Sequence, residues 1–161
     1  MVMVDPAERR IRNVALQLSL TLVLSSCAQV ESHHSNSTRS ERVETVNVVL
    51  KEWYVLADKM DVDEGDVNFK VHNQGRMEHE FIIIKTTQSM HDLPVNEKGL
   101  IEKKAGKMIT EIEDLHPGET REIEVHMIPG SYVLFCNKME MEDHKIISHY
   151  RKGMRVGFSV E

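Results

Sequence analysis

Short runs in which apolar and polar residues alternate recur along the chain from residue 44 onwards. Residues 67–71 and 156–160 both place Val, Phe and Val at every second position. Because successive side chains of a strand point to opposite faces, this period of two predicts half-buried strands. Turn-forming residues separate the runs at 63–66, 73–76, 115–119 and 129–130. Several short strands at this spacing, with little helix, indicate an all-β sandwich or barrel.

Two segments depart from the simple alternation. Residues 79–85 form an almost continuous apolar run, which is typical of a strand covered on both faces. Residues 86–110 scatter apolar side chains among Lys, Glu and Gly, which predicts a surface excursion with one short helix at 97–104. We expect strands to resume at 109–112.

The N-terminal segment has the features of an export signal. Three arginines, at positions 9, 10 and 12, precede an apolar run at 14–24 that is too short to span a bilayer as a helix. Leu24-Ser25-Ser26-Cys27 follows and resembles a bacterial lipobox, in which the cysteine receives lipid after cleavage. This predicts a membrane-anchored lipoprotein that faces the periplasm or the cell exterior. The alternative is an ordinary export signal in which Cys27 is coincidental.

The 161 residues are therefore expected to divide into three parts. These are a signal peptide at 1–26, a flexible tether at 27–43 that is rich in Ser, Asn and charge, and a folded domain at 44–161. Apolar residues make up 40% of the chain, enough for a core, while 29% charged residues argue against a membrane-embedded protein. The net charge of −6 argues against a nucleic-acid partner, because phosphate binding favours a basic surface.

One thiol, Cys136, remains in the domain if Cys27 carries lipid. A lone thiol in an oxidising compartment is a liability unless it is bound to something. Cys136 follows the apolar run 132–135, and His149 and Met154 come after it. His79, on a different predicted strand, is placed to add a second imidazole. Thiolate and thioether favour Cu(I) and imidazole serves both oxidation states, so this set predicts one copper site.

Four segments with these residues occur in a characteristic order. They are Asn73-x-Gly75-x-x-x-His79-Glu80-Phe81, Pro117-Gly118-Glu119-Thr120, Pro129-Gly130-x-Tyr132-x-x-x-Cys136 and His149-x-x-x-Gly153-Met154. Together they resemble the cupredoxins, the type 1 (blue) copper proteins, over residues 44–161. The resemblance implies a Greek-key β-sandwich that carries single electrons, with His79, Cys136, His149 and Met154 as the ligands of one copper. It also implies a monomer that is not an enzyme and that exchanges electrons with redox partner proteins at the membrane.

The loop between Cys136 and His149 departs from the pattern of that family. Twelve residues separate the two, where the family usually has a few, and the usual Pro-Gly is missing before the histidine. His144 is therefore a rival ligand, although His149 is favoured because Met154 lies within reach downstream of it. Met139 and Met141, beside His144, offer thioethers to a second Cu(I). The interleaved acidic residues favour an exposed loop instead.

Three functions are consistent with such a site. The first is an electron carrier, in which Ile146, Ile147 and Tyr150 would form an apolar patch around an exposed His149. The second is a periplasmic copper chaperone or copper-tolerance protein, which the ten methionines and nine histidines favour. The third is a small copper enzyme, which normally needs a further histidine cluster, and the sequence contains no His-x-His pair.

Overall fold

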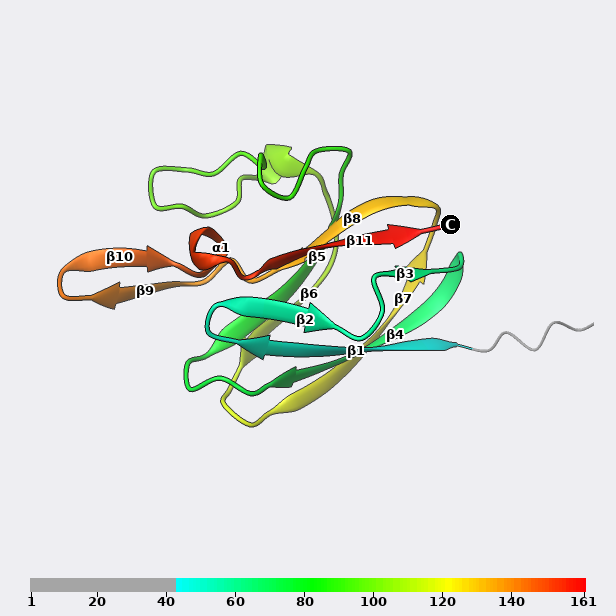
Figure 1. Ribbon diagram of the computed structural model, residues 1–161, viewed down its shortest axis with the longest axis horizontal. Coiled ribbons are helices and arrows are strands. Elements are labelled where there is room, and N and C mark those ends of the chain that lie inside the picture. The colour runs from blue at the N-terminus through cyan, green and yellow to red at the C-terminus, as the bar shows by residue number, and fades with distance from the viewer. Residues whose placement is uncertain (1–42) are drawn as a thin grey trace, which may run out of the picture. The chain divides into compact units, whose positions relative to one another are not determined.

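The computed structural model describes residues 43–161, in which two large β-sheets pack on a shared core (Figure 1). The predicted signal peptide, Cys27 and all but the last residue of the predicted tether lie outside the described residues. Within residues 43–161, no helix is both long enough and apolar enough to cross a membrane. The two sheets confirm the predicted all-β sandwich.

The first sheet has four strands, in which the predicted alternation is visible as alternating burial. Val46 and Val48 of its second strand are buried and lie opposite Phe69 and Val71 of the third, with which that strand pairs in parallel. The other pairings are antiparallel. In sheet order the strands are β2 (Tyr54–Ala57), β1 (Glu44–Lys51), β4 (Gly65–Asn73) and β7 (Thr120–Met127).

The second sheet has five strands and is covered on both faces along its middle. Phe81 and Ile83 of its fourth strand belong to the core between the sheets, while Ile82 and Ile84 belong to a second apolar cluster on the outer face. This double burial explains the continuous apolar run at 79–85. In sheet order the strands are β3 (Asp61–Val62), β11 (Arg155–Val160), β8 (Gly130–Phe135), β5 (His79–Lys85) and β6 (Lys107–Leu115).

Aromatic contacts join the sheets at the centre of the core. The ring of Phe69, from the first sheet, lies 5.8 Å from that of Phe81 and 5.7 Å from that of Phe158, both from the second. Tilted and edge-on pairs at this distance add about 0.5–1.5 kcal/mol each beyond the area they bury. The three rings therefore pack the two sheets together at the centre of the core.

The excursion after β5 covers the outer face of the second sheet. The predicted helix at 97–104 is wrong, since the segment contains only a 3-10 helix, Lys103–Ala105. Asn96 explains the difference, because its side chain accepts hydrogen bonds from the N–H groups of Lys98 and Leu100 and so stabilises a turn. Leu93 is buried in the outer cluster, so the excursion is a cover rather than a free loop.

The long segment between the second sheet's β8 and β11 forms a hairpin and one helical turn. Strands β9 (Met139–Glu142) and β10 (Lys145–Ser148) pair in a separate sheet that projects from the sandwich (Figure 1). Asp143 and His144 form the two-residue turn with φ of 47° and 64°, the positive values that tight hairpin turns require. The helix α1 (His149–Lys152) then returns the chain to β11.

Candidate metal centre

Three candidate ligands meet at one end of the sandwich. His79, Cys136 and His149 are all fully buried, and their donor atoms lie within 4.8 Å of one another. The two Nδ1 atoms are 3.2 Å apart. The Sγ of Cys136 lies 3.3 Å from Nδ1 of His149 and 3.9 Å from Nδ1 of His79. Residues separated by as much as 70 positions therefore converge on one point.

The strand pairing accounts for this convergence. His79 begins β5 and Cys136 follows the last residue of β8, and the two strands are antiparallel neighbours with Ile82 opposite Phe135. The start of one strand therefore lies beside the end of the other. His149 begins α1, and its backbone N–H donates to the carbonyl oxygen of Lys138, which ties the helical turn to the segment after Cys136.

The backbone of Met154 lies between the histidine and the cysteine. Its N–H donates to the carbonyl oxygen of His149 and its own carbonyl oxygen accepts from the N–H of Cys136, both at 3.1 Å. Its side chain is fully buried in the core cluster that also contains Cys136. Gly153 makes the turn before it with φ of 125°, where any Cβ would come within 2.9 Å of the carbonyl oxygen of Trp53.

A buried asparagine holds the loop that leads to His79. The side-chain amide of Asn73 donates to the carbonyl oxygens of Met77 and Leu115, and its oxygen accepts from the N–H of Gly75, all at 2.8 Å. Each polar atom of this fully buried side chain is thus satisfied. This network therefore fixes the loop that ends at His79.

Burial holds the thiol in its protonated form. It raises the pKa of Cys136 to about 12 despite the backbone N–H of Glu80, which donates to Sγ at 3.4 Å. A metal cation removes the cost of burying the charged thiolate, because it replaces the proton and compensates the negative charge. Cys136 is therefore a poor nucleophile but a good metal ligand.

Burial has the opposite effect on the two histidines. It lowers the pKa of His149 to about 4 and lowers the pKa of His79 as well. Both imidazoles are neutral near pH 7, so each has one nitrogen lone pair available for a metal. The Nε2 atom of each ring is buried and has no hydrogen-bond partner, while the Nδ1 atoms face each other and the thiol.

The arrangement fits a first-row transition metal. Protein-bound zinc, as a guide to size, has bonds of about 2.0 Å to imidazole and about 2.3 Å to thiolate. Donor atoms can then be at most about 4.3 Å apart, and all three measured separations are shorter than that. Two imidazoles, a thiolate and a nearby thioether are softer ligands than Mg²⁺ or Ca²⁺ accepts, and they suit copper.

Two neighbours of the site, Glu52 and Trp53, could not be identified from the sequence. Both lie in the turn between β1 and β2, far from the ligands in sequence. The ring of Trp53 stands edge-on to that of His149 with centroids 5.4 Å apart, and Glu52 lies beside His79. No motif marks either residue, since the contacts exist only once the two sheets have packed.

The predicted exposure of His149 is wrong. Its side chain is 0% exposed, and Tyr150, expected in the same surface patch, is buried with its hydroxyl donating to the carbonyl oxygen of Met90. The helical turn directs both side chains inward, and Trp53 packs against the imidazole. Ile146 remains exposed, on the hairpin.

His144, Met139 and Met141 lie away from the three converging donors. His144 is an exposed residue of the hairpin turn and does not belong to the buried cluster. Met139 and Met141, two positions apart on β9, are also exposed, at 44% and 70%. The tip of the hairpin therefore faces solvent.

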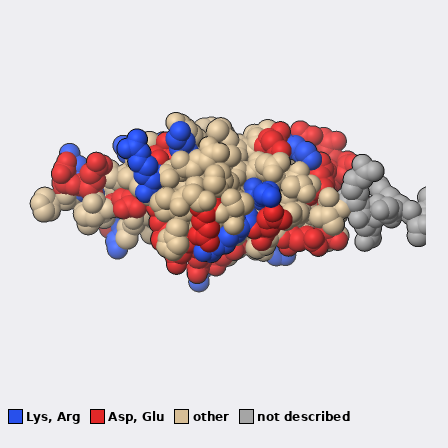
Figure 2. Space-filling view, turned by 90° about the horizontal axis from the view of Figure 1, so that it is seen from below, with Lys and Arg blue, Asp and Glu red and all other residues tan. Residues whose placement is uncertain are grey.

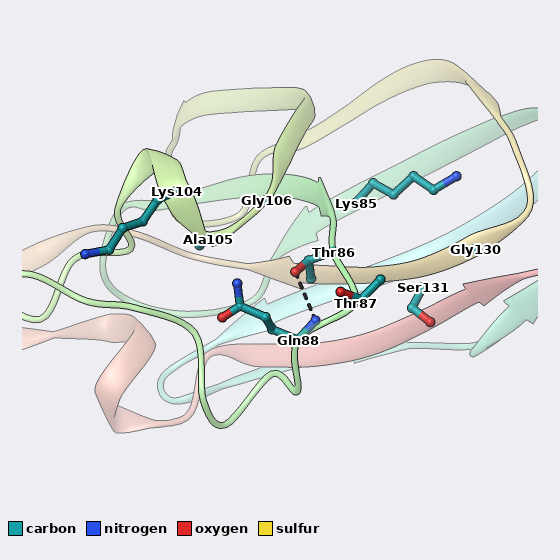
Figure 3. A pocket seen from close by; sticks show the side chains of 9 residues that line it. All are labelled: Lys85, Thr86, Thr87, Gln88, Lys104, Ala105, Gly106, Gly130 and Ser131. Carbon is teal, nitrogen blue, oxygen red and sulfur yellow. Dashed lines mark hydrogen bonds between the residues drawn. The ribbon is translucent and has the colours of Figure 1, made fainter.

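An open hollow of about 390 Å³ lies elsewhere on the second sheet (Figure 3). Its lining includes Lys85, Thr86, Gln88 and Lys104, and none of its residues is a cysteine or histidine. Lys85 donates to the carbonyl oxygen of Pro129 and Lys104 pairs with Glu102, so both ammonium groups already have partners. The hollow lacks the chemistry of a second metal site.

Comparison with known proteins supports the fold by structure alone. No protein-family model matches the chain, and neither does any curated protein sequence. Dithionite-reduced auracyanin from the photosynthetic bacterium Roseiflexus castenholzii is similar in structure, with a TM-score of 0.51 and 19% identity over 73% of this chain and 96% of that one. Auracyanin B gives a TM-score of 0.50 at 16% identity, over 73% of this chain and 88% of its own. A histidine-to-methionine variant of rusticyanin gives 0.50 at 17%, over 73% and 78%.

Proposed function

We propose that the domain at residues 44–161, which has the cupredoxin fold, binds one copper ion at a type 1 site and carries single electrons. The observation that carries the proposal is the convergence of two buried, neutral imidazoles and one buried thiol. When bound, copper supplies a one-electron couple at this point. The chain supplies the ligands, holds them in place and excludes water.

His79, Cys136 and His149 are the proposed strong ligands, and Met154 is the proposed weak axial ligand. The three strong ligands are fixed by strand ends, a helical turn and the Asn73 network, so little has to move when the oxidation state changes. The burial of all four side chains supports a site whose ligands do not exchange with solvent. These features suit an electron carrier.

The proposed partner is a redox protein at the membrane. Because His149 is buried, such a partner would meet the groups that cover it, among which Trp53 is half-buried and in contact with the imidazole. Figure 2 shows acidic and basic side chains interspersed over the face in view. With a net charge of −6, this mixture supports a protein partner over nucleic acid.

A copper chaperone or copper-tolerance protein is the second candidate. The exposed thioethers of Met139 and Met141 favour it, because thioethers bind Cu(I) and these two are open to solvent. A chaperone must release its ion, however, and the buried, strand-anchored ligands argue for retention. The two functions therefore differ in how readily the copper leaves.

Voltammetry paired with a competition assay separates them. For an electron carrier, we expect reversible one-electron cycling and retention of copper against a Cu(I) chelator, because the ligands are rigid and buried. The matched control is Met139→Leu/Met141→Leu, which removes both exposed thioethers and should leave cycling and retention unchanged. Ready loss of Cu(I), with slow or irreversible cycling, would make the protein a copper-handling protein instead.

We also propose that the protein is exported and anchored by lipid at Cys27, a residue outside the described part of the chain. The sequence Leu24-Ser25-Ser26-Cys27 supports this. The wild-type protein should partition into detergent and incorporate labelled fatty acid, and Cys27→Ser should release it because the acceptor thiol is gone. A mature N-terminus at another residue would contradict the proposal.

A further inference from the structure

Glu52 is fixed by the backbone of the loop that leads to His79. Its Oε1 accepts hydrogen bonds from the N–H groups of Arg76 at 2.6 Å and of Met77 at 2.8 Å. The carboxylate closes this loop much as a side chain caps a helix, by accepting from two successive N–H groups. Its position therefore follows from the same chain segment that positions the histidine.

The same oxygen faces the far side of the His79 ring. Oε1 of Glu52 lies 3.6 Å from Nε2 of His79, a buried atom with no hydrogen-bond partner. Gly75 keeps this approach open, since a Cβ at that position would lie 2.5 Å from the carboxylate oxygen and 2.8 Å from Nε2. A larger residue at position 75 would therefore push the Glu52 carboxylate and the His79 ring apart.

The carboxylate is charged near neutral pH. Burial by itself would raise the pKa of Glu52, but the N–H groups of Met77 and Arg76 lower it below its ordinary value. Its side chain is only 19% exposed, at the edge of an open hollow that Arg76 and Lys51 also line, so water screens the charge incompletely.

Other charged groups also lie near the site. Glu80 follows His79 in the chain, and burial raises the pKa of its carboxyl group. Glu140 has its Oε1 3.8 Å from Nε2 of His149, but its side chain is 39% exposed and lies on the hairpin. Lys138 is held by Glu78 and Asp114, so its positive charge is already matched. Of the two carboxylates that face a ligand ring, Glu52 has the shorter separation and is also held by two backbone N–H groups.

We propose that Glu52 is a positioning residue that orients His79 through Nε2 and favours Cu(II) over Cu(I) by its negative charge. This inference rests on the proposed function. A carboxylate beside Nε2 keeps the ring proton there, which leaves the lone pair on Nδ1 for the metal. Since Cu(II) carries one more positive charge than Cu(I), and reduction adds one electron at this site, a nearby anion stabilises the oxidised state more.

Glu52→Gln tests the effect of the carboxylate charge separately from the closure of the loop that leads to His79. The amide oxygen can still accept from Arg76 and Met77, so the loop should remain closed while the charge is lost. We expect the Cu(II) affinity to fall about tenfold, which is within the range for groups that hydrogen-bond to metal ligands. The Cu(I) affinity should change little. The reduction potential should then rise by about 59 mV, the equivalent of tenfold for one electron. Chelator competition in each oxidation state and voltammetry measure the three quantities.

Three further variants make the result specific. Asp66→Asn removes the same charge seven positions before Asn73 on β4, towards the opposite end of the sandwich, and should leave the potential unchanged. Glu52→Asp keeps the charge but withdraws it by one methylene group, so the potential should shift less than in Glu52→Gln. Glu140→Gln should shift the potential in the same direction but less, since that carboxylate is more exposed.

The inference and the proposed function fail in different ways. A wild-type protein without a blue Cu(II) adduct would overturn the proposed function. A blue wild-type protein in which Glu52→Gln has the potential of Asp66→Asn would overturn only the role of Glu52. An equal loss of Cu(I) and Cu(II) affinity in Glu52→Gln would also overturn it, because such a loss indicates a purely structural role.

Discussion

Replacing Cys136 with serine is expected to abolish the intense absorption near the red end of the visible spectrum that Cu(II) should give the wild-type protein. That band requires charge transfer from a thiolate to copper, and a serine oxygen cannot supply it. The hydroxyl can still accept from the N–H of Glu80, which now donates to Sγ at 3.4 Å, so we expect the variant to fold. Visible spectroscopy with stoichiometric Cu(II) measures the band, and thermal unfolding of the metal-free proteins checks the fold.

The second cysteine of the chain provides a matched control. Cys27→Ser should keep the full band, because Cys27 belongs to the predicted lipid anchor and not to the domain. If the colour survived in Cys136→Ser, or if the wild type gave a colourless Cu(II) adduct, the type 1 assignment would be wrong.

The second large effect is expected at His149. His149→Ala should lose the blue band, since one of the two nitrogen donors at the site disappears and leaves a buried space. Free imidazole should restore part of the absorption by entering that space as an external ligand. The visible spectrum, with and without imidazole, measures both changes.

The rival residue, His144, should be dispensable. His144→Asn suits the test better than alanine, because the turn holds this residue at φ of 64°, a conformation that asparagine tolerates. We expect the band to remain nearly unchanged, since His144 is exposed and outside the buried cluster. Loss of the band in His144→Asn, with retention in His149→Ala, would transfer the ligand role to the hairpin turn.

Local pattern was sufficient to predict most strands of the two packed sheets and the chemistry of the candidate ligands. Val67, Phe69 and Val71 alternate with polar residues, and all three are buried as a period of two requires. The candidate ligands could likewise be selected from the sequence, because thiolate, imidazole and thioether are properties of single residues. His79 and Cys136 lie close together because they are at the start of one strand and the end of its antiparallel neighbour.

Other features depended on contacts that no local pattern encodes. In place of the helix expected at 97–104, the chain forms a turn that the Asn96 side chain stabilises. The loop after Cys136 became a projecting hairpin, although its sequence reads as polar and irregular. In both cases, hydrogen bonds to particular side chains or strands outweighed a weak intrinsic preference.

The sequence by itself determined that the domain is all-β and carries a soft set of candidate ligands, because strand periodicity and ligand chemistry are local properties. Only the tertiary structure decided that His149 is covered by Trp53 and that Glu52 faces His79. These contacts join the turn between β1 and β2 to residues of the other sheet and its helical turn. Their existence depends on how two sheets pack, which is set by the whole core and not by any one segment.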